Sequence, residues 1–477
     1  MYRSYPRRLS YFFTLPFELR EEVLLALPPK EILSICSGVK DFKRVCLDET
    51  FWKRVWLKWV SPRLPEYRDR SIREILYGLV EKAKRMRPED LLFEGASKGI
   101  LFYVIEALER GAKVYLGDNW ALRQAAANGH LEIVKYLVKR GANISARNNE
   151  ALRKAATYGH FDIVRYLVEK GADVSANEDE ALWKAVANGH LDIVRYLVEF
   201  GGDVLEREEK VLRWAALNGR LDIVEYFVEK GANNFAREEA LIEAAANGYL
   251  EIVEYLVERR TNVSANEEKA LRIAAAKGYQ DIVEYLVESG ANVNAREDEA
   301  LRQAAANGHF EIVKYLVKSG ANVNAREDEA LRFAAANGFL EIVKYLVESG
   351  ANVSARDNEA LRWAAANGFL EIVKYLVEKG ANVNAREDEA LRFAAANGYL
   401  DVVEYLVESG ANISENGDEA LIGAAANGHL AVVKYFVEKG ANKFARDEAL
   451  IEAAANGHDD IVKYLVESGA DPSVLEY

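Results

Sequence analysis

Residues 359–386 read E-A-L-R-W-A-A-A-N-G-F-L-E-I-V-K-Y-L-V-E-K-G-A-N-V-N-A-R, and close variants of this phrase recur along most of the chain. The residue pair that opens the phrase returns in steps of 30 residues, except for two steps of 29. It begins at Ala121, Ala151, Ala181, Val211, Ala240, Ala270, Ala300, Ala330, Ala360, Ala390, Ala420 and Ala449. A fixed period of this length is typical of a solenoid, in which each repeat packs only on its neighbours.

Each repeat predicts two short helices. Gly368 suits the left-handed position that ends a first helix, and Gly380 ends a second one. Between them, apolar residues return at helical spacing, namely Leu370, Ile372, Val373, Leu376 and Val377. Two helices of about ten residues cannot bury their apolar faces alone, so neighbouring repeats must stack. We therefore expect an all-α fold.

Proline marks where the chain changes character, because seven of the eight prolines lie at or before Pro88 and the eighth is Pro472. Proline interrupts helices, so the stretch between these two positions favours short unbroken helices. We expect a three-helix N-terminal module, a helical connector and a repeat array, at residues 12–60, 61–90 and 91–477. The array should hold about 13 repeats, with a degenerate first repeat and a polar C-terminal cap at residues 91–117 and 449–477.

Charge and composition exclude several classes of function. The chain carries a formal charge of −14, and residues 1–90 hold 19 Lys+Arg against 13 Asp+Glu, so the remainder is strongly acidic. An acidic array disfavours binding to nucleic acid or to an anionic membrane. Cys36 and Cys46 are the only cysteines, which gives no disulfide framework and suits a reducing compartment. We read no signal peptide and no membrane span.

The repeat resembles the ankyrin repeat. Its hallmarks here are G-H-L-E-I-V-K-Y-L-V and G-A-N-V-N-A, which recur about twelve times with small changes. The resemblance implies a helical solenoid that binds other proteins. Two features depart from the family pattern: the usual period is 33 residues, and the first helix usually starts T-P-L-H where this chain has E-A-L-R. The projecting hairpin should therefore be shorter than usual.

The N-terminal module resembles the F-box. The family pattern L-P-x-E-L, a hydrophobic helix ending in L-P, and a closing aromatic and basic segment are matched in order by Leu15, Pro16, Glu18, Leu19, Leu27, Pro28, Val39, Phe42, Lys43, Arg44, Val45, Phe51, Trp52 and Lys53. Phe42 stands where tryptophan is common. The combination of an F-box with 30-residue ankyrin repeats is similar to the ankyrin proteins of giant DNA viruses.

This second resemblance implies a substrate-recruiting subunit of a cullin-RING (SCF-type) ubiquitin ligase. The module would bind a Skp-type adaptor through Leu15, Pro16, Leu19, Val23, Leu27, Leu33 and Val39. A physical argument points the same way, because about 45 residues can bury only a small core, yet these carry many large apolar side chains. The alternative is a non-catalytic scaffold or competitive inhibitor whose N-terminal helices only cap the stack.

One position of the first helix varies widely in an otherwise monotonous framework. It should face away from the core side, and it is apolar at Trp214, Ile273, Phe333, Trp363 and Phe393. Exposed aromatic side chains in successive repeats are typical anchors of protein interfaces, so we predict that these residues bind the target. The alternative is that they pack against the residue that follows the mid-repeat glycine. The arginine one position earlier, as in Arg362, is expected to form solvated ion pairs with the glutamate three residues before it.

No enzymatic function is expected. The six histidines share one repeat phase, which separates them by about one helix spacing and is too far for a common metal ion. No cysteine cluster, phosphate-binding glycine loop or nucleophile beside a histidine is present in the sequence. We therefore predict no cofactor, an unidentified target protein as partner, a monomer, and a cytoplasmic location (the host cytoplasm for a viral protein) with the nucleus as the alternative.

Overall fold

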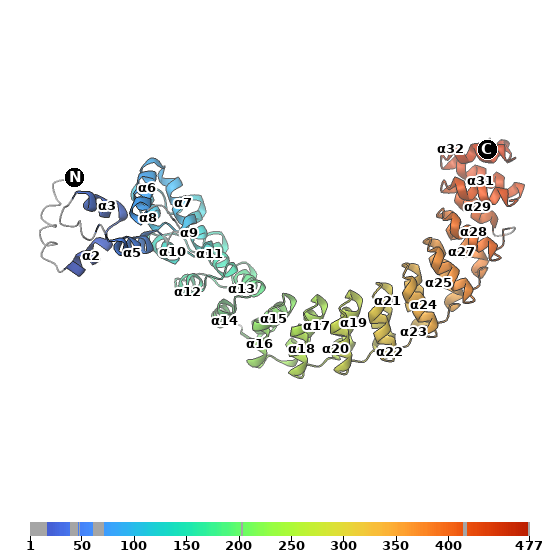
Figure 1. The fold of residues 1–477 in the computed structure, drawn as a ribbon, viewed down its shortest axis with the longest axis horizontal. Helices are drawn as coiled ribbons and strands as arrows, with labels where there is room; N and C mark the ends of the chain where they lie inside the picture. The colour runs from blue at the N-terminus through green and yellow to red at the C-terminus, as the bar shows by residue number, and fades with distance from the viewer. Residues whose placement is uncertain are drawn as a thin grey trace. The chain divides into compact units, whose positions relative to one another are not determined.

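The structure is a computed structural model that describes residues 17–38, 46, 48–60, 71–201, 204–413 and 417–475. It comprises two compact units, Met1–Gly231 and Ala232–Tyr477. All the regular elements in the described ranges are helices, which confirms the all-α expectation (Figure 1). None of these helices combines the length and the apolar character needed to cross a membrane.

Four helices precede the repeats in the part of the first unit that the structure describes. They are α2 (Phe17–Leu25), α3 (Pro29–Gly38), α5 (Glu49–Trp59) and α6 (Ile72–Arg85). Ser71 caps α6 through a reciprocal capping box, in which its side chain accepts from the Glu74 backbone while the Glu74 carboxylate accepts from the Ser71 backbone. Helix α6 covers both α5 and α3, so the module and the connector share one core.

The array consists of helix pairs, thirteen of them in the described ranges. In the first unit they are α7 (Pro88–Lys98) with α8 (Leu101–Glu109), α9 (Leu116–Ala127) with α10 (Leu131–Lys139), α11 (Ala146–Thr157) with α12 (Phe161–Glu169), α13 (Ala176–Asn188) with α14 (Leu191–Phe200), and α15 (Val204–Leu217) with α16 (Leu221–Glu229). The expected degenerate first repeat corresponds to α7 and α8.

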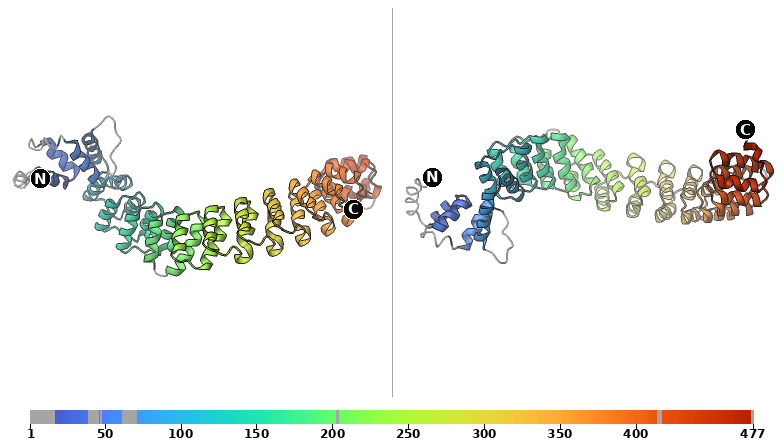
Figure 2. Two further views of the ribbon diagram at one scale, coloured as in Figure 1. Left: turned by 60° about the horizontal axis from the view of Figure 1, so that its bottom comes forward. Right: turned by 90° about the horizontal axis from the view of Figure 1, so that it is seen from above.

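The second unit continues with eight pairs. They are α17 (Asn234–Asn247) with α18 (Leu250–Glu258), α19 (Ala265–Lys277) with α20 (Gln280–Glu288), α21 (Ala295–Ala306) with α22 (Phe310–Lys318), α23 (Ala325–Ala336) with α24 (Leu340–Glu348), α25 (Ala355–Ala366) with α26 (Leu370–Glu378), α27 (Ala385–Ala396) with α28 (Leu400–Glu408), α29 (Gly417–Ala426) with α30 (Leu430–Glu438), and α31 (Lys443–Ala455) with α32 (Asp459–Glu467), followed by the 3₁₀ turn η2 (Pro472–Leu475). Within each unit the first helices form one row and the second helices another (Figures 1 and 2).

The core runs between these two rows and is nearly free of solvent. In the repeat of α25 and α26, Leu361, Ala364 and Ala365 are fully buried, and so are Val373 and Leu376. Alanine at two successive core positions lets neighbouring first helices approach closely, because its side chain takes little space. The repeated phrase therefore positions every first helix in the same way and leaves its variable position on the opposite side.

Eight of the first helices open with a feature that the sequence did not predict. Three successive residues adopt positive φ before the right-handed helix starts; in α23 they are Arg326, Glu327 and Asp328, with φ of 52°, 56° and 61°. Residues other than glycine disfavour this conformation by about 1–2 kcal/mol each. The turn persists because its third residue is tied to the next repeat: Asp328 Oδ1 accepts from the Asn352 backbone at 2.7 Å.

The two first helices that follow the 29-residue steps, α17 and α31, begin without this turn. Their N-terminal residues are capped directly by an asparagine. Asn233 Oδ1 accepts from the Ala236 backbone at 2.8 Å, and Asn442 Oδ1 accepts from the Ala445 backbone at 2.9 Å. Each repeat that follows a step shortened by one residue thus lacks the left-handed turn at the start of its first helix.

Candidate protein-interaction surfaces

The N-terminal module has a filled core. Trp52 and Phe51 of α5, Ile32 of α3 and Leu24 of α2 are each 0–1% exposed. The indole N–H of Trp59 donates to the Leu25 carbonyl at 3.2 Å, which fastens α5 to α2. Most of the apolar side chains that the structure describes in this module therefore pack within it and against α6.

The predicted adaptor-binding residues differ in how far this packing buries their side chains. Val23 is 40% exposed, Leu27 is half-buried and Leu33 is only 8% exposed. Leu15, Pro16 and Val39 lie outside the described residues, and Leu19 belongs to α2 without a described side chain. Leu33 is thus a core residue, because α6 covers α3, while Val23 remains at the surface.

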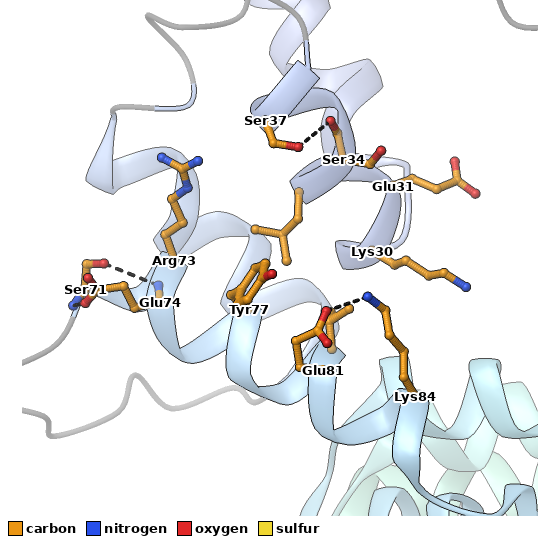
Figure 3. Close-up of a pocket in the computed structure, with 12 residues that line it drawn as sticks. Lys30, Glu31, Ser34, Ser37, Ser71, Arg73, Glu74, Tyr77, Glu81 and Lys84 are labelled. Carbon is orange, nitrogen blue, oxygen red and sulfur yellow. Dashed lines mark hydrogen bonds and ion pairs between the residues drawn. The ribbon is translucent and has the colours of Figure 1, made fainter. Parts of the chain in front are cut away.

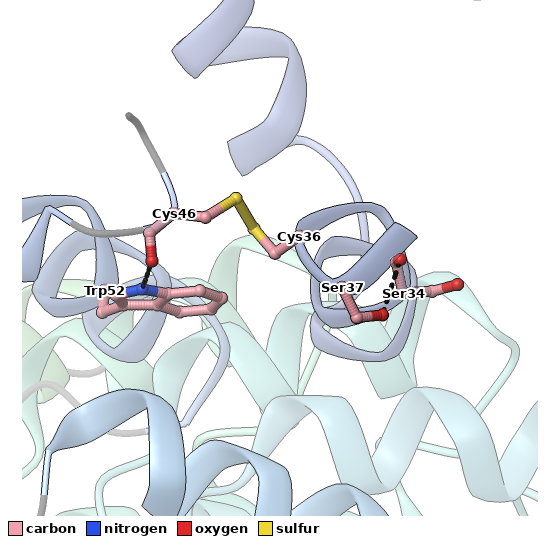
Figure 4. Close-up of a disulfide and its surroundings, with 5 residues drawn as sticks. All are labelled: Ser34, Cys36, Ser37, Cys46 and Trp52. Atoms are coloured by element: carbon pink, nitrogen blue, oxygen red, sulfur yellow. Dashed lines mark hydrogen bonds between the residues drawn. A yellow bond between two sulfur atoms is a disulfide. The ribbon is translucent and has the colours of Figure 1, made fainter. Parts of the chain in front are cut away.

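The two cysteines form one disulfide, which our expectation of no disulfide framework did not include. Cys36 at the end of α3 and Cys46 before α5 are joined by a disulfide with their Cα atoms 5.6 Å apart (Figure 4). The Trp52 indole N–H donates to the Cys46 carbonyl at 3.0 Å, so the bond lies beside the module core. Sequence spacing could not reveal this pairing, because it depends on how α3 and α5 pack.

A groove of about 770 Å³ lies between α3 and α6. Ser34 and Ser37 line one wall, and Tyr77 and Glu81 line the other (Figure 3). Glu81 pairs with Lys84 on the same helix, and Ser37 donates to the Ser34 carbonyl at 2.9 Å. The polar side chains at this groove are thus largely engaged with one another.

The predicted target-binding residues reach the surface to different extents. Trp214, Phe333 and Phe393 are 37–39% exposed, Trp363 is 45% exposed and Ile273 is half-buried. They stand on α15, α19, α23, α25 and α27. Each of the four aromatic side chains is thus partly exposed, with more than half of its surface covered. Target binding by these residues stays a prediction, and so does the alternative that they pack against the residue after the mid-repeat glycine.

Trp214 belongs to a local aromatic pair in the first unit. Its ring stacks on Trp183 with centroids 5.5 Å apart and an interplanar angle of 26°. Trp183 occupies the position that is arginine in most repeats, and its indole N–H donates to the Glu178 carbonyl at 2.8 Å. The sequence reasoning identified Trp214 but missed this partner.

The residue after the mid-repeat glycine has a neighbour that we did not consider. Its ring lies against the glycine of the preceding repeat, as Phe369 does at Gly338, where an added Cβ would come within 2.7 Å of the ring. Histidine uses the same place and adds a hydrogen bond: His160 Nε2 lies 3.0 Å from the Ala127 carbonyl. These histidines therefore join repeats. Burial lowers the pKa of His130, which has the same arrangement.

The arginine beside the variable position corrects our expectation of solvated pairs. Arg332 is 5% exposed, and its Nε and Nη2 donate to the turn carbonyls of Glu327 at 2.9 Å and Arg326 at 3.0 Å. Its Nη1 donates to Glu359 of the next repeat at 2.8 Å. We call this arrangement the arginine clamp. Equivalent inter-repeat pairs join Arg123 to Glu150, Arg302 to Glu329, and Arg362 to Glu389.

The sequence does contain a signal for the clamp. Where Trp183 or Ile242 replaces the arginine, the partner position 27 residues later is Lys210 or Lys269 instead of glutamate. Such paired exchange is expected when two positions form an ion pair across a repeat junction. Ile422 also replaces the arginine, but there the residue before the next Ala-Leu pair is still a glutamate, Glu448. Because we considered glutamates only within the same helix, the reasoning missed this signal.

The arginine clamp compensates the charge of the glutamate that lies next to an aromatic residue of the variable position. Glu359 accepts from both Arg332 and the Trp363 indole N–H, the latter at 3.0 Å. Burial acts to raise the pKa of Glu359, but these hydrogen bonds and the positive charges of Arg332 and Arg356 outweigh it and lower the pKa. The carboxylate is therefore ionised and compensated, so the surface around Trp363 carries little net charge.

A family model described as ankyrin repeats (3 copies) matches the chain in six overlapping stretches, at residues 92–178, 174–238, 212–297, 295–357, 333–416 and 391–475. These stretches cover the array and begin four residues after the start of α7. The comparison with curated proteins gives no match.

Proposed function

This chain belongs to the ankyrin-repeat family, whose members bind other proteins, and from that premise we propose that it is a substrate-recruiting subunit of a cullin-RING (SCF-type) ubiquitin ligase. In this proposal the array holds a target protein, and the N-terminal module binds a Skp-type adaptor. The chain itself performs no chemistry, and its function is to hold the target near the ligase.

The observation that carries the adaptor part is the exposure of Val23 on α2. Val23 belongs to α2, which begins within the L-P-x-E-L motif, and it is 40% exposed although the module has a filled core. Leu57 on α5 adds a second apolar side chain at 46% exposure. Leu57 lies beside Leu101 and His130 of the array, so the exposed side chain of Val23 carries the argument. Arg54 pairs with Glu21 and Glu22, which holds α5 against α2. An exposed apolar surface on a small helical module favours a partner.

A specific observation also favours the second candidate, a scaffold or competitive inhibitor. The module and the connector are joined to the array by a core contact and a surface ion pair. Tyr103 of α8 donates to the Leu79 carbonyl of α6 at 3.1 Å, and Lys30 of α3 pairs with Glu106 at 3.5 Å at the surface. Burial raises the pKa of Tyr103 to about 12, as expected for a side chain inside a shared core. These contacts are those of a helical cap on the stack.

Size-exclusion chromatography separates the two candidates. The purified chain is mixed with a Skp-type adaptor, and we expect co-elution that Val23→Asp abolishes, because the charge would lie in the apolar contact. The double variant Leu15→Asp with Leu19→Asp tests the rest of the motif. Tyr115→Asp is the control, since Tyr115 is 62% exposed and lies on the array. Circular dichroism checks that each variant folds. Absence of co-elution, or co-elution that survives the Val23 and Leu15/Leu19 variants, leaves the scaffold as the function.

A further inference from the structure

Three successive repeats present aromatic side chains at the same position of their first helices. We call Phe333, Trp363 and Phe393 the aromatic ridge; they stand on α23, α25 and α27 and are 37–45% exposed. The flanking repeats carry Gln303 and Gly423 at this position, so the ridge ends after three residues. It lies entirely within the second unit.

The polar groups beside the ridge are already engaged. The Trp363 indole N–H donates to Glu359 at 3.0 Å. The side-chain nitrogens of Asn337, Asn367 and Asn397 donate to carbonyls of the preceding repeat at 2.9–3.0 Å. A peptide that needs hydrogen-bond donors for its own backbone carbonyls finds few here. A helix satisfies its backbone internally and needs none.

The spacing of the ridge is close to that of residues seven apart in a helix, and the backbone hydrogen bonds decide between the helix and a polyproline segment. Packed helices lie about 8–10 Å apart, so successive ridge residues have roughly that separation. In a helix, residues seven apart share a face and are about 10.5 Å apart along the axis. In an extended strand, residues on one face are about 6.6 Å or about 13 Å apart, which misses the ridge spacing. A polyproline helix repeats at about 9.3 Å but leaves its backbone carbonyls unpaired.

The charges of the protein indicate which residue types the ligand should carry toward the ridge and on its flanks. The glutamates at the base of the ridge are compensated, because Glu329 pairs with Arg302 at 2.6 Å, as Glu359 does with Arg332. The ridge itself is therefore apolar. The chain as a whole carries −14, so its longer-range field attracts basic partners.

From these observations we propose that the aromatic ridge binds an amphipathic helix of a partner protein, with apolar side chains at three successive heptad positions and basic residues on its flanks. Three anchors seven residues apart require a helix of at least about 15 residues. The proposal rests on the protein-binding role of the array stated above and is independent of the adaptor.

Designed peptides test this geometry on the full-length chain. The probe is a fluorescently labelled helical peptide of three heptads, with leucine at one position of each heptad and alanine, lysine and glutamine elsewhere. A second peptide of the same composition has its leucines six residues apart, and a proline-rich peptide of equal length is the third. We expect fluorescence anisotropy to show at least tenfold tighter binding of the heptad peptide than of either comparison peptide.

Variants then locate the binding. Trp363→Ala should weaken binding of the heptad peptide at least tenfold, and Phe333→Ala and Phe393→Ala by somewhat less, because a central aromatic anchor dominates such contacts. Phe235→Ala is the matched control, since Phe235 is 62% exposed on α17 and lies off the ridge, and it should leave affinity unchanged. Circular dichroism and thermal unfolding confirm that these surface variants fold.

The proposal is overturned if the heptad and six-residue peptides bind equally, if the proline-rich peptide binds best, or if Trp363→Ala leaves affinity unchanged. Val23→Asp separates this result from the adaptor test, because it should abolish adaptor co-elution and leave peptide affinity intact. Loss of adaptor binding therefore removes only the ligase proposal, and loss of ridge binding removes only this one.

Discussion

The 30-residue and 29-residue repeats form the same kind of junction by different means. In a 30-residue repeat, the left-handed turn directs carbonyls inward, and Arg332 binds two of them together with Glu359 of the next repeat. In the 29-residue repeat of α17 the turn is missing, and Ile242, 4% exposed, takes the place of the arginine. Lys269 then replaces the glutamate. In this repeat the carbonyl acceptors, the donor and the counter-charge are thus all absent.

Trp183 shows whether the left-handed turn depends on the hydrogen bonds to its carbonyls or on the ion pair to the next repeat. It keeps the turn but has no guanidinium, and its indole N–H still donates to the Glu178 carbonyl at 2.8 Å. The charge partner is lost, because the next repeat has Lys210. The turn therefore requires a hydrogen-bond donor from this position, whereas the ion pair to the next repeat is an addition that arginine makes available.

The largest expected effect comes from removing the clamp. Arg332→Leu leaves two turn carbonyls without their donor and Glu359 without a buried partner, so we expect it to destabilise the second unit by about 3–5 kcal/mol. Urea denaturation followed by circular dichroism measures this, and hydrogen exchange should show the loss centred on α23 and α25. Arg326→Leu is the control: Arg326 is half-exposed and its pair with Glu297 at 3.0 Å lies at the surface, so its loss should cost far less stability than loss of the clamp. Equal effects of the two variants would remove the distinction between clamp and surface pair.

The reverse exchange tests the 29-residue repeat. Ile242→Arg introduces a buried charge where the turn carbonyls are missing and Lys269 lies at the partner position, so we expect a loss of about 2–4 kcal/mol. Adding Lys269→Glu should recover about 1 kcal/mol, which a double-mutant cycle measures directly. If Ile242→Arg is tolerated without loss, the arginine is not tied to the turn.

Replacing the residue before the first helix should affect stability differently in the two kinds of repeat, but by less than the changes above. Asn233→Ala removes the side chain that accepts from the Ala236 backbone at 2.8 Å, and it should cost about 1 kcal/mol. Ser354 precedes the left-handed turn of a 30-residue repeat and makes no side-chain cap, so Ser354→Ala should change stability by less than about 0.5 kcal/mol. Thermal unfolding of both variants measures the difference. A comparable loss in Ser354→Ala would mean that the two starts are stabilised alike.

The sequence predicted the regular part of this molecule well. The period, the helix pairs and the glycine that ends each first helix follow from local pattern, because every repeat meets the same neighbours. The left-handed turn could not be predicted from the sequence, because Arg326, Glu327 and Asp328 are ordinary residues for the start of a right-handed helix and none of them is glycine. What fixes the turn is the Asn352 backbone of the next repeat, which no single-repeat pattern contains.

The candidate surfaces were predicted less completely for the same reason. The variable position was found because its residue type changes while its neighbours do not, and Phe333, Trp363 and Phe393 are indeed exposed. Leu33 was taken as adaptor-binding because an F-box-like pattern does not show that α6 covers α3. The Cys36–Cys46 disulfide likewise depends on tertiary packing.

The smallest effect concerns the third residue of the turn, which is Asp328 in one repeat and Asn358 in the next. Both Oδ1 atoms accept from the following repeat's backbone, at 2.7 Å and 2.8 Å, so the hydrogen bond does not need the charge. Burial raises the pKa of Asp328, which the Asn352 N–H and Arg332 only partly oppose. Because the native pKa lies above the unfolded value, ionisation weakens folding, and this penalty is fully present above the native pKa. It disappears as the pH falls toward the unfolded value near 3.9.

Asp328→Asn should therefore stabilise the second unit at pH 7, by up to about 1 kcal/mol, and the gain should shrink as the pH is lowered through the raised native pKa. Asn358→Asp is the reverse variant and should lose stability at pH 7 and regain it in acid. Urea midpoints measured between pH 7 and pH 4 test both. A pH-independent difference would show that the aspartate acts through shape alone. A loss of stability in Asp328→Asn would show that the positive charge of Arg332 makes the buried carboxylate favourable despite its burial.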